Sequence, residues 1–205
     1  MIKEDTFPGV VEHRAFSGAG KTLLVLCAVA LAAAAALTEE HMGLLRPGDP
    51  APPFTAVLST GKAVALSDYR GKQPLVLFFY PRDETAGCIA EVCSFRDSYG
   101  AIRAAGAALL GVSFDPPDSH DRFIAHYGLP FPLIADTGRG LSRQYGAVRW
   151  EGPWPRMKRV TYVIDRDGII RGVFLHELLV SRHAGDVLSL LNTMQSLPGA
   201  SRHNP

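Results

Sequence analysis

A continuous run of apolar and aromatic side chains, residues 75–80, constrains the fold of this chain more than any other feature. The sequence Leu-Val-Leu-Phe-Phe-Tyr is typical of a strand that is buried on both faces of a sheet. Pro81 ends the run. Residues 88–105 then place Val92 and Phe95 near helical spacing. A buried strand that leads through a proline-containing loop into a helix predicts a layered α/β domain.

Further strands and helices alternate around this unit. We expect strands at residues 107–114, 131–135, 160–164 and 169–175, and helices at residues 120–127, 139–145 and 186–197. Hairpins are expected at residues 54–66 and 160–175, each around a short turn containing glycine. The proline-rich residues 46–53 predict a stiff, extended linker. The pattern predicts an α/β fold, with a mixed central sheet flanked by helices on both faces and an N-terminal hairpin.

Composition excludes several classes of protein. The chain has 205 residues, 47 % of them hydrophobic, which is enough for a sizeable core without disulfides or metals. The formal net charge is +1 with no basic block, so we expect no nucleic-acid partner. Three cysteines, Cys27, Cys88 and Cys93, are too few for a disulfide scaffold. The scattered histidines offer no zinc spacing, and we expect no metal and no cofactor.

The first 45 residues predict a separate extension. Its apolar run, residues 22–37, follows Lys21 and precedes Glu39 and Glu40, an order typical of a signal peptide or membrane anchor. We therefore expect an anchored or exported protein on the periplasmic side. The alternatives are a cytoplasmic protein with an alanine-rich helix, or a start codon assigned too far upstream. We expect the folded domain at residues 46–198 and a polar tail at residues 199–205.

Cys88 is the candidate nucleophile, because it stands at the start of the expected helix. Free N–H groups and the helix dipole at that position favour an anion, and a cysteine so placed carries more thiolate. Thr85, three residues earlier, can bring a hydroxyl beside the sulfur. The competing interpretation is that Cys88 packs in the core and that Thr85 caps the helix.

Cys93 follows Cys88 by five residues. On a regular helix this step separates the two Cα atoms by roughly 8–9 Å, whereas a disulfide needs less than about 7 Å. A bond between them therefore requires the first turns of the helix to unwind, and such a bond would be strained and easily reduced. The alternative for Cys93 is a packing position on the helix.

The residues around Cys88 resemble those of the peroxiredoxins. The active-site pattern Pro81-x3-Thr85-x2-Cys88 is present. The extended pattern resembles the bacterioferritin-comigratory-protein, or peroxiredoxin Q, branch, and the likeness covers residues 45–197. The residues that carry it are Phe78, Phe79, Tyr80, Arg82, Asp83, Gly87, Glu91, Cys93, Phe95, Arg96 and Asp97, with the segments 46–54, 66–72, 111–113, 131–136, 145–147 and 159–165.

The resemblance implies a thioredoxin-like fold and a thiol-dependent peroxidase that serves antioxidant defence and redox homeostasis. Cys88 would attack the peroxide, helped by Pro81, Thr85 and Arg159, and Cys93 would resolve the sulfenic acid as a disulfide. The implied partners are a hydroperoxide substrate and a thioredoxin-like dithiol reductant. The branch is often monomeric, with a dimer as the alternative. This chain departs from the pattern at Ala86, where the family usually has proline, and in the proline-containing stretch 150–158.

Other interpretations fit less well. A disulfide oxidoreductase of thioredoxin type needs C-x-x-C, and here the spacing is C-x4-C. A copper-delivery protein of similar fold would need closer cysteines and a dedicated histidine. For Arg159 the alternative role is a surface salt bridge at a strand start. Four of the seven histidines lie in the expected domain, and we expect solvated or capping roles for them: His120, His126, His176 and His183.

Overall fold

The computed structural model describes residues 43–151, 154–176, 179 and 182–196. The predicted signal or anchor run, residues 22–37, and the tail of residues 199–205 lie outside these ranges, so both remain predictions. Within the described ranges, no helix has both the length and the apolar character needed to cross a membrane.

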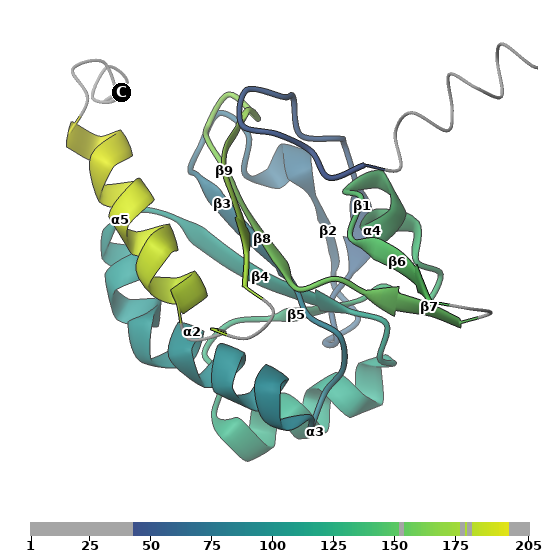
Figure 1. Cartoon of the computed structure of the whole chain (residues 1–205). Coiled ribbons are helices and arrows are strands. Elements are labelled where there is room, and N and C mark those ends of the chain that lie inside the picture. The colour runs from purple at the N-terminus through teal and green to yellow at the C-terminus, as the bar shows by residue number, and fades with distance from the viewer. Residues whose placement is uncertain (1–42, 152–153, 177–178, 180–181, 197–205) are drawn as a thin grey trace, which may run out of the picture. The chain divides into compact units, whose positions relative to one another are not determined.

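A five-stranded mixed sheet forms the centre of the domain, in the order β5-β4-β3-β8-β9 (Figure 1). The strands are β3 (Leu75–Phe79), β4 (Ala108–Ser113), β5 (Leu133–Ala135), β8 (Val160–Ile164) and β9 (Ile170–Leu175). The run at residues 75–80 is the central strand, as predicted: β3 pairs in parallel with β4 and antiparallel with β8. Every residue of β3 is buried, because both faces of the sheet are covered.

The two faces of the sheet carry different layers. Side chains alternate along each strand, so Val76 and Phe78 pack with α2, α3 and α5. Leu75, Leu77 and Phe79 pack on the other side, with the β1–β2 hairpin and α4. The elements of these layers are α2 (Ala86–Ala104), α3 (Pro117–Tyr127), α5 (Arg182–Ser196), β1 (Thr55–Val57), β2 (Ala63–Ala65), the 3-10 turn η2 (Leu66–Asp68) and α4 (Gly140–Gln144).

Three helices begin earlier than predicted. The extended backbone of Thr85 caps α2, so that helix begins at Ala86 instead of at Cys88. Pro117 is the first residue of α3, a position where proline's fixed φ and missing N–H cost nothing. α5 begins at Arg182, four residues before the predicted start. The hydrophobic spacing locates the middle of each helix, whereas its first turn depends on the cap.

Two features of the fold differ from the prediction. The stretch after α4 forms an antiparallel ribbon, β6 (Val148–Glu151) and β7 (Trp154–Met157), in which Trp150 pairs with Pro155. A two-stranded ribbon has two free edges, so it accepts a proline that a central strand would exclude. In addition, part of the expected linker is hydrogen-bonded to the sheet. The N–H of Gly48 donates to the Ile170 carbonyl at 2.8 Å, and the N–H of Ile170 donates to the Asp49 carbonyl at 2.9 Å.

Candidate active site

Cys88 lies in the first turn of α2, just beyond the end of β3. The chain leaves β3, passes the half-buried Pro81 and enters α2 at Ala86, with Thr85 as the N-cap residue. Cys88 is the third residue of the helix, and its side chain is 0 % exposed. The N–H groups of a first helical turn have no carbonyl partner within the helix, and with the helix dipole they favour negative charge at this position.

Arg159 brings a positive charge to the sulfur. Val160 pairs with Phe79 in the antiparallel β8–β3 ladder, so Arg159 lies at the end of β3 where the loop to Cys88 departs. Its Nη2 donates to Sγ of Cys88 at 3.5 Å. Burial by itself would lower the pKa of Arg159, but the nearby Glu91 carboxylate and the Cys88 sulfur outweigh it, and the pKa is raised.

Glu91 holds the other side of the same guanidinium. It lies three residues after Cys88, on the inward side of α2, and is 0 % exposed. Its Oε2 accepts a hydrogen bond from Nη1 of Arg159. Glu91 had no predicted role beyond its place in the family pattern. The available signal was an acidic residue one helical turn from the candidate nucleophile, among apolar positions that face the core.

Gly87 lets the guanidinium reach the sulfur. A Cβ atom added at this position would lie 3.2 Å from Nη2 of Arg159, closer than ordinary van der Waals contact. The flat guanidinium therefore packs against bare backbone beside Cys88. This contact gives a physical reason for glycine directly before the cysteine.

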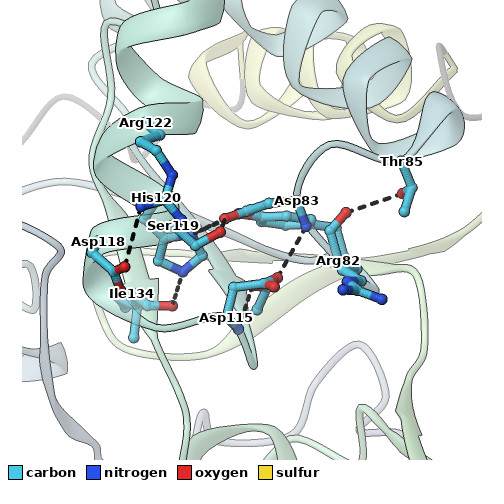
Figure 2. Close-up of polar contacts among 11 residues, drawn as sticks. Arg82, Asp83, Thr85, Asp115, Asp118, Ser119, His120, Arg122 and Ile134 are labelled. Atoms are coloured by element: carbon cyan, nitrogen blue, oxygen red, sulfur yellow. Dashed lines mark hydrogen bonds and ion pairs between the residues drawn. The ribbon is translucent and has the colours of Figure 1, made fainter.

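Thr85 is exposed and occupies the cap position, but its hydroxyl makes no capping bond. Oγ1 instead donates to the carbonyl of Arg82 at 3.0 Å (Figure 2). Thr85 is therefore the cap residue, as the competing interpretation expected, but it caps the helix through its backbone and not through its hydroxyl. Because the hydroxyl proton is committed to Arg82, the lone pairs of Oγ1 remain available as acceptors.

Cys93 lies five residues beyond Cys88 in the same uninterrupted helix, and its side chain is half-buried. Both thiols are free in the part of the chain that the structure describes. The helix over residues 88–93 is regular, so the separation expected from helical geometry, roughly 8–9 Å between Cα atoms, holds in this state.

Two histidines are buried, and their expected solvated role is wrong. His183 is 0 % exposed; its Nδ1 lies 2.8 Å from Thr161 Oγ1, and its Nε2 lies 3.9 Å from Oε1 of Glu91. Burial lowers its pKa to about 4. His120 is also 0 % exposed and contacts Asp83 of the loop before α2. The spacing of these histidines in the sequence shows no ligand pattern, so it did not reveal their buried contacts.

Comparisons with known proteins point to one family. The family model described as "AhpC/TSA family" matches residues 47–173. The chain is 38 % identical to a chloroplastic peroxiredoxin Q from Sedum lineare, over 72 % of this chain and 78 % of the relative. It is 35 % identical to a putative peroxiredoxin bcp from Coxiella burnetii, over 70 % of this chain and 97 % of the relative.

Solved structures give the same result. The peroxidoxin BcpB of Mycobacterium tuberculosis superposes with a TM-score of 0.70 at 31 % identity, covering 74 % of this chain and 99 % of that one. The bacterioferritin comigratory protein of Xanthomonas campestris superposes with a TM-score of 0.64 at 30 % identity, covering 69 % and 91 %. These neighbours confirm the thioredoxin-like α/β fold. The chain therefore belongs to the AhpC/TSA family, with relatives in the peroxiredoxin Q and bacterioferritin-comigratory-protein branch, and it is a thiol-dependent peroxidase.

Proposed function

We propose that Cys88 is the peroxidatic cysteine and that Arg159 positions the peroxide against its sulfur. The observation that carries this proposal is the contact of 3.5 Å between Nη2 of Arg159 and Sγ of Cys88 in the first turn of α2. A guanidinium stabilises negative charge on sulfur, and its planar fork suits the two oxygens of a peroxide. Nε of Arg159 has no hydrogen-bond partner among the described residues, so one further N–H can donate to the substrate.

Thr85 and Pro81 complete the proposed site. The hydroxyl of Thr85 donates to Arg82, so its oxygen accepts the O–H of the bound peroxide and orients the O–O bond toward the sulfur. Pro81 lies between β3 and the cap of α2, where its fixed φ restricts the loop that carries Thr85. The role of both residues is orientation.

The reaction proceeds in two steps, an oxidation by the peroxide and a condensation that loses water. The thiolate of Cys88 attacks one peroxide oxygen, the O–O bond breaks, and the leaving oxygen departs with a proton as water or an alcohol. Cys88 is then a sulfenic acid. The first turns of α2 unwind, the thiol of Cys93 attacks the sulfenic sulfur, and a Cys88–Cys93 disulfide forms as water is lost.

A dithiol of thioredoxin type closes the cycle by thiol–disulfide exchange. The proposed substrates are hydrogen peroxide and organic hydroperoxides, in the service of antioxidant defence and redox homeostasis. The bacterioferritin comigratory protein of Xanthomonas campestris is described as having alkyl peroxide reduction activity, which supports the organic substrates. The reductant must share the compartment of the enzyme, which depends on the N-terminal residues 1–45.

The Cys88→Ser and Cys93→Ser variants of the full chain test these roles. We expect Cys88→Ser to lose peroxide consumption with a dithiol reductant, because serine is a far weaker nucleophile. After one equivalent of peroxide, mass spectrometry should find an intrachain disulfide in the wild type and a sulfenic acid in Cys93→Ser. Full turnover by Cys88→Ser would refute the proposal. A sulfenic acid that persists in the wild type would remove Cys93 from the cycle.

A further inference from the structure

The loop before α2 is fastened to α3 by a buried cluster of polar side chains (Figure 2). Asp83 is 4 % exposed and His120 of α3 is 0 % exposed. Nδ1 of His120 lies 2.9 Å from Oδ2 of Asp83, and Ser119 Oγ donates to the same oxygen at 2.8 Å. Tyr80 donates its hydroxyl to Oδ1 at 2.7 Å. Three side chains thus converge on one carboxylate.

Both ring nitrogens of His120 face hydrogen-bond acceptors. Nδ1 faces the carboxylate of Asp83, and Nε2 lies 3.2 Å from the carbonyl oxygen of Ile134. A carboxylate and a carbonyl both accept hydrogen bonds, so the geometry suits a ring that donates from both nitrogens. The hydroxyl of Tyr80 also lies 3.4 Å from Nδ1. Burial would raise the pKa of Asp83, but the hydrogen bond and charge of His120, with the hydroxyls of Tyr80 and Ser119, hold that pKa below its usual value.

The same contacts fix the main chain of the loop. The N–H of Asp83 donates to Oδ2 of Asp115, at 3.0 Å. The next residue, Glu84, has φ +56°, a left-handed conformation that a residue other than glycine keeps only when its surroundings enforce it. Its carboxylate accepts from Tyr127 Oη at 3.2 Å and lies 3.5 Å from Nδ1 of His126. The two residues directly before Thr85 are therefore both bound to α3.

We infer that His120 is a positioning residue for peroxide reduction, acting through the buried ion pair that it forms with Asp83. We call this pair the His120–Asp83 clasp. The inference rests on the proposed role of Cys88. When closed, the clasp holds the loop that carries Thr85 and so keeps the first turn of α2 folded, with Cys88 against Arg159. When open, it frees the loop, and the turn unwinds toward Cys93.

The clasp therefore sets a balance between two states of the enzyme. The folded state reacts with peroxide, and the unwound state forms the disulfide. A sulfenate held too long in the folded state meets a second peroxide, which transfers an oxygen to give sulfinic acid and leaves as water or an alcohol. Weakening the clasp is expected to slow the first reaction and also to protect Cys88 from this overoxidation.

The test compares the full-length His120→Gln and Asp83→Asn variants with Asp121→Asn, which removes an exposed charge from the same helix. In the clasp variants kcat/KM for peroxide should fall by roughly tenfold, since a small misplacement of reacting groups costs one to two orders of magnitude. The peroxide concentration that converts half of Cys88 to sulfinic acid should rise several-fold. Asp121→Asn should leave both values unchanged.

Equal kcat/KM and equal overoxidation in the clasp variants and the wild type would overturn the inference. So would a fall in kcat/KM with unchanged overoxidation, because simple loss of folded protein gives that result. If Cys88→Ser still turned over peroxide, the proposed function itself would fail, before any clasp variant is compared.

A second test uses the wild-type protein, so it needs no substitution of a buried residue. With 15N-labelled histidine, the ring of His120 should show both nitrogens protonated at neutral pH. A ring with one bare nitrogen would overturn the charged clasp.

Circular dichroism of each variant, compared with Asp121→Asn, reports whether the fold is retained.

Discussion

At the scale of single residues, one guanidinium joins the whole site. Arg159 contacts the sulfur of Cys88 through Nη2 and the carboxylate of Glu91 through Nη1. A buried arginine needs such partners, because an uncompensated charge in the core is costly. The ion pair with Glu91 also orients the guanidinium, so that Nη2 faces the sulfur of Cys88. The geometry of the guanidinium is therefore as important as its charge.

Arg159→Lys separates these two properties. Lysine keeps the positive charge, but its single ammonium cannot serve Cys88 and Glu91 in the same planar geometry. We expect kcat/KM for peroxide to fall by about 100-fold, the usual cost of losing an oriented donor to developing charge. Stopped-flow measurement of peroxide consumption checks this value. The control is Arg156→Lys, an exposed arginine on β7, which should retain full activity.

The site residue that the sequence predicts most directly is Cys88, because its position between a strand and a helix has a direct chemical meaning. Arg159 was chosen over its neighbour Arg156 only through the family pattern. Glu91, His120 and His183 were missed as partners. Their importance comes from burial and from contacts 22 to 68 residues away along the chain, and no local spacing reveals such contacts.

At the scale of elements, α2 has two conflicting tasks in the proposed mechanism. Its first turn must be folded to hold Cys88 beside Arg159, and it must unwind for Cys88 to reach Cys93. Unwinding also removes Glu91 from Arg159, since Glu91 lies between the two cysteines. Two glycines of the helix allow the contact with Arg159 to be tested separately from the stability of the helix.

We expect Gly87→Ala and Gly100→Ala to differ although both lie in α2. A Cβ at Gly100 meets nothing within 4 Å, whereas one at Gly87 lies 3.2 Å from Arg159 Nη2. Gly100→Ala should increase the free energy of unfolding by about 1 kcal/mol through helix propensity, with unchanged activity. Gly87→Ala should displace the guanidinium and lower kcat/KM. Urea titrations and peroxide assays measure the two effects, and identical activities would contradict the role of Gly87.

At the scale of the whole molecule, α5 closes the core over the site. It packs against α2 and β9, and its His183 is buried beside Thr161 of β8. Burial, and to a lesser degree the electrostatic effects of His176 and Arg159, lowers the pKa of His183 from 6.5 to about 4. The folded protein thus excludes a proton that the unfolded chain binds between these values.

This proton makes stability depend on pH in a defined direction. The contribution of His183 is complete above pH 6.5 and is lost as the pH falls toward 4. From pH 7 to pH 5 the loss should be about 2 kcal/mol. Urea unfolding at both pH values should show this loss in the wild type and a smaller one in His183→Gln. An exposed histidine variant, His126→Gln, is the control and should keep the wild-type slope.

The order of strands and helices was predictable because each has its own hydrophobic period. The continuous run in β3 and the spacing in α2 both identified their elements correctly. The β6–β7 ribbon was not predicted, because its prolines indicate a loop. Its two strands also pair only with each other and not with the central sheet. The attachment of residues 48–51 to β9 and the turn before it was also missed, because backbone hydrogen bonds of a proline-rich segment leave no trace in the side-chain pattern.

That attachment fixes residues 48 and 49 at one end of the sheet. Gly48 and Asp49 bind at Ile170, which pairs with Ile164, the residue opposite Leu75 at the start of β3. Cys88 follows the other end of β3. The chain upstream turns back toward that other end: Gly43 lies against Gly146, and the next residue, Ala147, accepts the N–H of Lys158 beside Arg159. Residues 43–49 therefore lie along the domain between the two ends of β3.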